Sequence, residues 1–162
     1  YFRYCDDMLF IVPTEIRDAI AGEVKVEIQK LKIDINTDKT ERRTFIMESG
    51  IQRADKPLQY LGFTFDGQRV LLRSASLARY SDRMKRGVKM AKATMRKRNA
   101  ARLLRGEEPK PLFKRKLYKR YSHLGRKNFL RYGYRASETL DTTAIKKQLK
   151  PLWLRLQREI EK

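Results

Sequence analysis

The stretch that decides the fold opens the chain and reads YFRYCDDMLFIV, residues 1–12. Aromatic and apolar residues alternate on both sides of Asp6-Asp7, a pattern typical of two short strands joined by a tight turn. Aspartate is favoured in turns and tolerates positive φ, so we expect the acidic pair at the tip of a β-hairpin. Two carboxylates at one tip repel each other and offer hard oxygen ligands, which favours a Mg²⁺ site. The alternative is an exposed Asp-Asp turn on an ordinary hairpin.

The segment after this hairpin predicts a helix and then further strands. Apolar residues recur every three or four positions at Ile16, Ile20, Val24, Ile28 and Leu31, which predicts a helix that buries one face against a sheet. The period then changes to two, which predicts a strand over 31–35. A turn at 36–38 and a partner strand at 44–47 follow.

The next stretch predicts a second hairpin. Residues 49–57 are typical of a loop. Apolar residues over 60–65 and 69–72 flank an Asp66-Gly67 turn, and Asp-Gly between apolar strands is the strongest short signal for a hairpin.

From residue 74 onward the apolar spacing predicts only helices. The first has Ser74 or Ser76 as its N-cap and is ended by residues 106–109. A short segment closes near Gly133, and the last helix spans about 141–161. Phe129, Leu130 and Tyr132 lie in the short segment. The apolar residues expected on the buried faces of the other helices are Leu77, Tyr80, Met84, Val88, Ala91, Met95, Phe113, Leu117, Tyr121, Ile145, Leu149, Leu152, Leu156 and Ile160. Strands followed by helices predict an α+β fold.

Charge divides the chain more sharply than hydrophobicity does. The 162 residues carry a formal net charge of +20. Residues 1–72 have a net charge of −1, whereas residues 73–135 hold 22 basic and 3 acidic residues, a net charge of +19. Residues 136–162 add +2. We therefore expect two parts, 1–72 and 73–162, and nucleic acid as the partner of the second.

Composition also bounds the compartment. Cys5 is the only cysteine, so no internal disulfide can form, which favours a reducing compartment. No apolar run approaches the roughly 20 residues that cross a bilayer, and no signal-peptide pattern opens the chain. We expect an intracellular, cytoplasmic protein that does not bind membranes.

The first predicted helix of the basic part carries its cations in a row. Lys85, Lys89, Lys92 and Arg96 recur at helical spacing, and the row is widened by Arg79, Arg83 and Arg86. We call the first four the basic stripe. A rod with one apolar and one cationic side can follow a duplex backbone, because phosphate contacts position a protein without reading sequence. The alternative is a solvated basic face without a dedicated partner.

Three motifs in order resemble the reverse transcriptase family. Tyr4-Cys5-Asp6-Asp7 closely resembles its Tyr-x-Asp-Asp motif. The segment 31–40, which ends in Lys39-Thr40, resembles the next motif of the polymerase palm. Tyr60-Leu61-Gly62-Phe63 resembles the hairpin that grips the primer strand. The resemblance is closest to prokaryotic enzymes of group II introns, retrons and phage defence, and it covers the first 72 residues.

The resemblance implies a fold, a reaction and roles for these residues. The fold would be a partial antiparallel polymerase palm followed by an all-helical thumb. Asp6 and Asp7 would bind two Mg²⁺ ions, for which Mn²⁺ can substitute, and Lys39 would lie near the incoming nucleotide. Residues implied to contact the primer or other nucleic acid are Tyr4, Tyr60, Leu61, Gly62, Phe63, Arg79, Arg83, Lys85, Lys89, Lys92 and Arg96.

The resemblance also implies that this chain works as part of a larger enzyme. The third metal-binding aspartate of the family lies upstream of the Tyr-x-Asp-Asp hairpin and matches nothing here, and Tyr1 begins in mid-strand. We expect a C-terminal piece of an RNA-directed DNA polymerase that is incomplete alone. Its partners would be an RNA template, a DNA or RNA primer, deoxynucleoside triphosphates and the rest of the polymerase.

Two other functions fit the same pattern. One is a non-catalytic RNA-binding module built on a polymerase remnant. The other is a related palm enzyme, either an RNA-dependent RNA polymerase or a terminal transferase. Residue types alone do not separate these readings.

Overall fold

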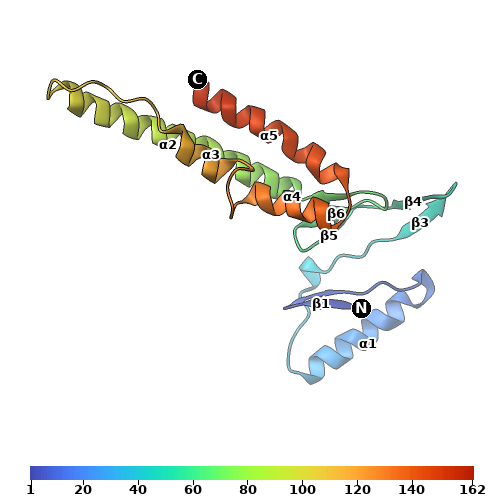
Figure 1. The fold of residues 1–162 in the computed structure, drawn as a ribbon. Helices are drawn as coiled ribbons and strands as arrows, with labels where there is room; N and C mark the ends of the chain where they lie inside the picture. The colour runs from blue at the N-terminus through green and yellow to red at the C-terminus, as the bar shows by residue number, and fades with distance from the viewer. The chain divides into compact units, whose positions relative to one another are not determined.

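The structure is a computed structural model that describes residues 1–162. The chain divides into two compact units, one of residues 1–60 with 66–68 and one of residues 61–65 with 69–162. Five α-helices are combined with small antiparallel sheets, consistent with the α+β prediction (Figure 1). None of the helices has both the length and the apolar composition needed to span a bilayer.

The first unit is built from two hairpins and one helix. Strands β1 (Phe2–Tyr4) and β2 (Asp7–Leu9) pair antiparallel, as predicted, with Tyr4 opposite Asp7. The 3₁₀ turn η1 (Thr14–Ile16) leads into α1 (Arg17–Lys30), and η2 (Thr37–Lys39) follows. The remaining strands are β3 (Phe45–Glu48), β4 (Ile51–Ala54) and β5 (Leu58–Tyr60).

The strand predicted over 31–35 is wrong. The chain leaves α1 through Lys32, whose φ is +57° and whose N–H donates to the Gln29 carbonyl, which is a helix-ending geometry. The strand β3, its expected partner, pairs instead with β4 in the stretch predicted as a loop. Ser49 and Gly50, with φ of +51° and +77°, form the turn between them, as a type I′ hairpin requires.

The apolar face of α1 is not buried as predicted. Ile20, Val24 and Ile28 are half-buried, whereas Ile16 and Leu31 are exposed. Two-stranded ribbons offer too little surface to cover a helix, which explains the difference. Every fully buried apolar side chain lies at Leu72 or later in the chain, so the first unit has no closed core.

The second unit contains the two strands of the predicted Asp-Gly hairpin, whose turn residues 66–68 are grouped with the first unit. Strand β6 (Phe63–Phe65) pairs with β7 (Val70–Leu72), and Gly67, with φ of +103°, lies in the connecting turn. The first strand is shorter than predicted, because Leu61 and Gly62 have φ of +49° and +88° and form a turn of their own.

Four helices complete the second unit. They are α2 (Ser74–Leu103), α3 (Lys114–Tyr121), α4 (Phe129–Thr139) and α5 (Thr143–Glu161). The core contains Leu72, Tyr80, Met84, Val88, Leu117, Tyr121, Leu130, Ile145, Leu149, Leu152, Leu156 and Ile160. All five residues predicted on the last helix are therefore buried. Trp153 packs against this core from the same helix.

Three details of the helices differ from prediction. Neither Ser74 nor Ser76 is the N-cap of α2, because the cap position is Arg73 and no side chain accepts a hydrogen bond there. Phe113 is 68% exposed, since it is the N-cap of α3 and lies outside the helical face. Gly133 does not end α4 but is buried within it.

The reason for the buried glycine is a close approach between elements. A Cβ atom on Gly133 would lie 2.8 Å from Cδ1 of Leu149 and 3.1 Å from Cδ1 of Leu72. Both leucines are almost completely buried. The glycine therefore lets α4 pack directly against α5 and the end of β7.

Hydrogen bonds fix the same elements to one another. The Gln148 side chain accepts from the Leu72 N–H (2.9 Å) and donates to the Leu72 carbonyl (3.1 Å), so α5 holds the backbone of β7. The Tyr80 hydroxyl donates to the Tyr121 carbonyl at 2.6 Å, which joins α2 to α3. Burial raises the pKa of Tyr80, so this donor keeps its proton.

One residue interrupts the hydrogen bonding of α5. Pro151 lies inside this helix and has no backbone N–H to donate. The side chain of Arg155, one turn further on, donates to the Ser81 hydroxyl at 2.9 Å and ties this part of α5 to α2.

The close approach at Gly133 predicts a sharp response to added volume. Gly133→Val should destabilise the second unit by about 2–3 kcal/mol, because the valine overlaps the ends of two buried leucines, which must shift within the packed core. Urea unfolding followed by the fluorescence of Trp153, the only tryptophan, measures this loss. Ala100→Val, at an exposed position of α2, is the matched control and should cost under about 1 kcal/mol. Equal stability of the two variants would refute the packing argument.

Candidate functional site

The turn between β1 and β2 separates the two acidic residues. Cys5 and Asp6 form the turn, whereas Asp7 begins β2, so the prediction that both acids lie in the turn is wrong for Asp7. Cys5 has a φ of +55°, which is unusual for a residue with a side chain. The Arg3 guanidinium donates from Nε to the Cys5 carbonyl at 2.9 Å and braces this conformation.

The two carboxylates are available to a ligand. Asp6 and Asp7 are both exposed. Ion pairs in this unit engage other acids, and none of them engages Asp6 or Asp7. Adjacent carboxylates without a cationic partner repel each other, and a divalent cation with a preference for oxygen relieves that repulsion. Carboxylate oxygens are ligands that Mg²⁺ and Mn²⁺ prefer, but the structure gathers no group of three or more His, Cys, Asp or Glu side chains that could hold a metal ion.

Exposed aromatic side chains lie along this hairpin, with Tyr4 next to the turn and Tyr1, Phe2 and Phe10 toward its open end. Tyr4, the residue paired with Asp7, is 62% exposed. Tyr1 stacks on Phe10 with ring centroids 4.9 Å apart, and Phe2 is 59% exposed. An exposed aromatic next to a carboxylate can contact the sugar or base of a nucleotide as well as another protein surface.

The predicted turn lysine lies in η2. Lys39 is the last residue of this 3₁₀ turn and is exposed. Its backbone N–H donates to the Asn36 side chain at 3.2 Å, and the Thr40 hydroxyl donates to the Asn36 carbonyl at 2.9 Å. Asn36 therefore fixes the backbone on both sides of Lys39, and neither of these hydrogen bonds involves the Lys39 ammonium group.

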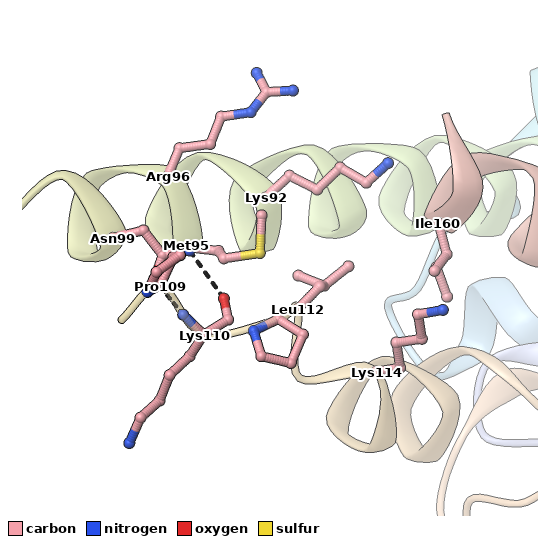
Figure 2. Close-up of a pocket in the computed structure, with 10 residues that line it drawn as sticks. Lys92, Met95, Arg96, Asn99, Pro109, Lys110, Leu112, Lys114 and Ile160 are labelled. Carbon is pink, nitrogen blue, oxygen red and sulfur yellow. Dashed lines mark hydrogen bonds between the residues drawn. The ribbon is translucent and has the colours of Figure 1, made fainter. Parts of the chain in front are cut away.

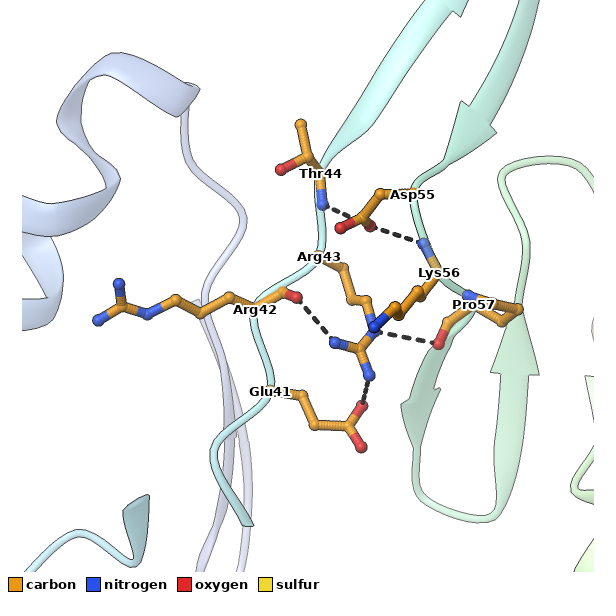
Figure 3. A network of polar contacts seen from close by, with 7 residues as sticks. All are labelled: Glu41, Arg42, Arg43, Thr44, Asp55, Lys56 and Pro57. Carbon is orange, nitrogen blue, oxygen red and sulfur yellow. Dashed lines mark hydrogen bonds and ion pairs between the residues drawn. The ribbon is translucent and has the colours of Figure 1, made fainter. Parts of the chain in front are cut away.

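A polar network holds the segment after η2 against the end of β4 (Figure 3). The Arg43 guanidinium donates to the Glu41 carboxylate (2.8 Å) and to the Pro57 carbonyl (3.3 Å). The Asp55 carboxylate accepts from the Thr44 N–H at 3.0 Å, and the Asp55 N–H donates to the Thr44 carbonyl at 3.0 Å. These bonds replace the apolar core that this unit lacks.

Asp55 also accepts from the Lys56 N–H at 2.7 Å. The backbone N–H groups of Thr44 and Lys56 lower the pKa of the Asp55 carboxyl. A lowered pKa means that the contribution to stability is complete above the ordinary pKa of about 3.9 and is lost as pH falls through the lowered value.

The four residues of the predicted primer-contacting hairpin fall on both sides of the division between units. Tyr60 ends β5 in the first unit, whereas Leu61, Gly62 and Phe63 belong to the second. Leu61 is exposed, and nothing lies within 4 Å of a Cβ built on Gly62, so this turn is open to a ligand. Phe63 instead packs against the core, 6.0 Å from the Tyr132 ring.

The basic stripe lines a groove between α2 and the C-terminal end of α5. All four of its residues contribute, and the groove has a volume of about 420 Å³. Arg86 also lines the groove, whereas Arg79 and Arg83 do not. We call this feature the stripe groove.

Two residues of the stripe groove are missed by the sequence analysis. Glu159 and Lys162 line it from α5 and form an ion pair at 2.9 Å. The hydrogen bond from Lys162, with smaller contributions from Lys85 and Lys92, lowers the pKa of Glu159. Helical spacing places residues on a face of their own helix but does not reveal which distant helix lies beside that face, so no sequence signal identifies them.

Comparisons with known proteins supply no family. No protein-family model matches the chain, and no curated protein matches it at a significant level.

The network around Asp55 predicts a local effect. Asp55→Ala should speed amide hydrogen exchange at Thr44 and Lys56 by about three- to tenfold, because each N–H loses its acceptor. Exchange followed by NMR gives the protection of each amide. Asp34→Ala, an exposed acid of the same unit, should leave both rates unchanged. If the two variants behave alike, Asp55 does not hold this segment.

Proposed function

We propose that this chain is the palm-and-thumb part of a reverse transcriptase, an RNA-directed DNA polymerase that extends a primer with deoxynucleotides. The observation that carries the proposal is the β1–β2 hairpin, which presents Asp6 and Asp7 at one end without ion-pair partners. On this proposal the first unit belongs to the palm. The basic helical part, which follows the Leu61-Gly62 turn, belongs to the thumb.

The proposal gives the residues of the hairpin distinct tasks. Asp6 and Asp7 would hold Mg²⁺, with Mn²⁺ as a substitute, and two such ions would supply charge neutralisation at the attacking and leaving oxygens. Tyr4 would lie beside the primer end. Lys39 would bind the triphosphate, where an ammonium group lowers the cost of developing negative charge.

The nucleic acid would lie along the second unit. The stripe groove offers cations from one flank of α2, and α2 itself extends for about 45 Å, since each of its 30 residues rises 1.5 Å. A rigid cationic rod of this length suits a duplex backbone better than a single phosphate. The open Leu61-Gly62 turn would approach the primer strand.

The finer assignments extend the same proposal. The third metal-binding aspartate and the fingers would come from the rest of the polymerase, with an RNA template and a DNA or RNA primer as partners. Among relatives, the motifs point to the prokaryotic group of intron, retron and phage-defence enzymes, and a role in antiviral defence would follow from the last of these. Such an enzyme would act in the bacterial cytoplasm.

A second candidate is an RNA-binding module without catalysis. It is favoured by one observation: the basic unit holds the entire buried core, whereas the unit with the carboxylates holds none. In that case the β1–β2 hairpin would be a scaffold and its acids would have no metal.

Substitution of the acidic pair tests the first candidate. Asp6→Asn and Asp7→Asn should each lower primer extension by the parent polymerase at least about a hundredfold, because each removes a metal ligand. Primer extension on an RNA template with deoxynucleotides is the measurement. Ribonucleotide and template-free reactions distinguish the related polymerases and the terminal transferases.

The 162-residue chain itself provides the control for this test. Mn²⁺ should broaden the amide signals of residues 5–7, and either substitution should weaken that effect. Asp34→Asn, which changes an exposed acid outside the motif, should preserve both synthesis and broadening. Synthesis that persists in the Asp6 or Asp7 variant would refute the polymerase assignment.

Salt dependence tests the proposed duplex contact. Replacement of Lys85, Lys89 and Arg96 by glutamine should reduce the slope of log affinity against log salt by about 0.9 for each lost phosphate contact. The matched control replaces Lys146, Lys147 and Lys150, three exposed lysines of α5, by glutamine. Fluorescence anisotropy with a labelled duplex gives both slopes. Equal slopes for the two triple variants would mean that the stripe groove makes no specific contact.

A further inference from the structure

A second concave site lies beyond the stripe groove, and the proposed function does not use it. It is formed where the chain returns along α2 after residue 103, and its volume is about 520 Å³. Figure 2 shows α2 on one side of it and the residues before α3 on the other. The side chains that line it are those of Lys92, Met95, Arg96, Asn99, Pro109, Lys110, Pro111, Leu112, Lys114 and Ile160. We call it the return hollow.

Specific hydrogen bonds keep the return hollow open at a fixed width. Asn99 on α2 donates from its amide nitrogen to the Lys110 carbonyl (2.8 Å) and accepts from the Lys110 N–H (2.9 Å). The reversal itself is fixed by Gly106, whose φ is +72°, and by the Arg105–Glu107 ion pair at 2.7 Å. The two sides of the hollow are therefore joined at its outer end.

The chemistry of the lining restricts the ligand. The floor is apolar, and Figure 2 shows Met95 and Leu112 turned toward each other across it. Four cations form the rim, namely Lys92, Arg96, Lys110 and Lys114, and no acid lines the hollow. A ligand must therefore combine a negatively charged part with an apolar body.

The return hollow continues the stripe groove. Lys92 and Arg96 line both features, so the two adjoin along α2 and share two cations. From Lys85 to Asn99 the helix rises about 21 Å, or roughly six phosphates of one duplex strand. A strand that follows the stripe groove therefore reaches the hollow.

We infer that the return hollow binds an unpaired nucleotide, with its base on the apolar floor and its phosphates on the rim. Its volume lies in the range of small-ligand sites and is too small for a duplex. Unpaired bases expose apolar faces that pack on aliphatic and thioether groups, and the sulfur of Met95 suits such a face. Single-stranded nucleic acid thus meets both requirements of the lining.

The same geometry predicts that the hollow reads sequence only weakly. The amide of Asn99 uses one N–H and one oxygen lone pair on the Lys110 backbone, which fixes its orientation and leaves only one donor and one acceptor site for a base edge. The other polar groups of the lining are cations, which bind phosphates of any sequence.

The inference rests on the proposed function, which places a duplex beside the hollow. Three probes test the inference and the proposed function separately. The 162-residue chain is titrated by anisotropy against a blunt duplex, the same duplex with a short unpaired extension, and the extension alone. The unpaired extension should tighten binding about tenfold over the blunt duplex. Lys110→Gln/Lys114→Gln should abolish this gain and leave blunt-duplex affinity within about twofold.

The control variant is Lys97→Gln/Arg98→Gln, which removes the same charge from exposed positions of α2 outside the hollow. It should retain the tenfold gain. Extensions that carry 4-thiouridine should cross-link under ultraviolet light to peptides containing residues 95–99 or 109–114. Cross-links confined to other parts of the chain would overturn the inference.

The remaining outcomes also discriminate. If the chain binds no duplex but binds the single strand in a Lys110- and Lys114-dependent way, the proposed thumb function fails and the hollow stands. If the duplex binds but the extension adds no affinity, the hollow fails and the thumb function stands. An acidic peptide that displaces the extension with the same dependence on both lysines would identify a protein ligand and refute the nucleotide.

Discussion

The contact on which the second unit depends is the junction of β7, α4 and α5 at Gly133. There a glycine brings α4 against Leu149 and Leu72, and Gln148 bonds both backbone groups of Leu72. The junction links the only hairpin of this unit to its helices. Because the segment 73–135 has a net charge of +19, repulsion among its cations opposes compaction, and this close-packed junction is part of what offsets it.

The two units are stabilised by different kinds of interaction. The second gathers every buried apolar side chain, and its cations lie on the outside of α2 and α3. The first is held by hairpin pairing and by the Arg43 and Asp55 network. Polar networks and short ribbons unfold locally more easily than packed cores, so Asp6 and Asp7 lie in the unit that opens locally at the lower free-energy cost. If Asp6 and Asp7 are catalytic, a further surface is needed to hold their hairpin in place. If the basic unit only binds nucleic acid, no such surface is needed.

Sequence periodicity predicted the second unit well and the first unit poorly. The seam of α5 was predicted residue by residue, because Ile145 to Ile160 repeat with a helical period and face a real core. The prediction of a strand at 31–35 is wrong because a period of two does not show whether a partner strand is available. The expected partner, β3, pairs with β4 instead. Gly133 was read as a helix end because sequence does not reveal that two leucines meet there. Of the candidate site, the hairpin around Asp6 was predictable from its turn residues. The Asn99 contacts were not, because they join residues 11 apart through a reversal set by Gly106.

The proline within α5 has a mechanical consequence. Without an N–H at position 151, one rung of the helix ladder is missing between the half that carries Ile145 and Leu149 and the half that carries Glu159 and Ile160. The first half is anchored at the β7 junction, and the second borders both concave sites on α2. The second half is held against α2 as well, because Arg155 donates to the Ser81 hydroxyl at 2.9 Å and Leu156 and Ile160 are buried. The missing rung therefore falls between two parts of α5 that tertiary contacts both hold in place, so the proline costs the helix one hydrogen bond without freeing its end.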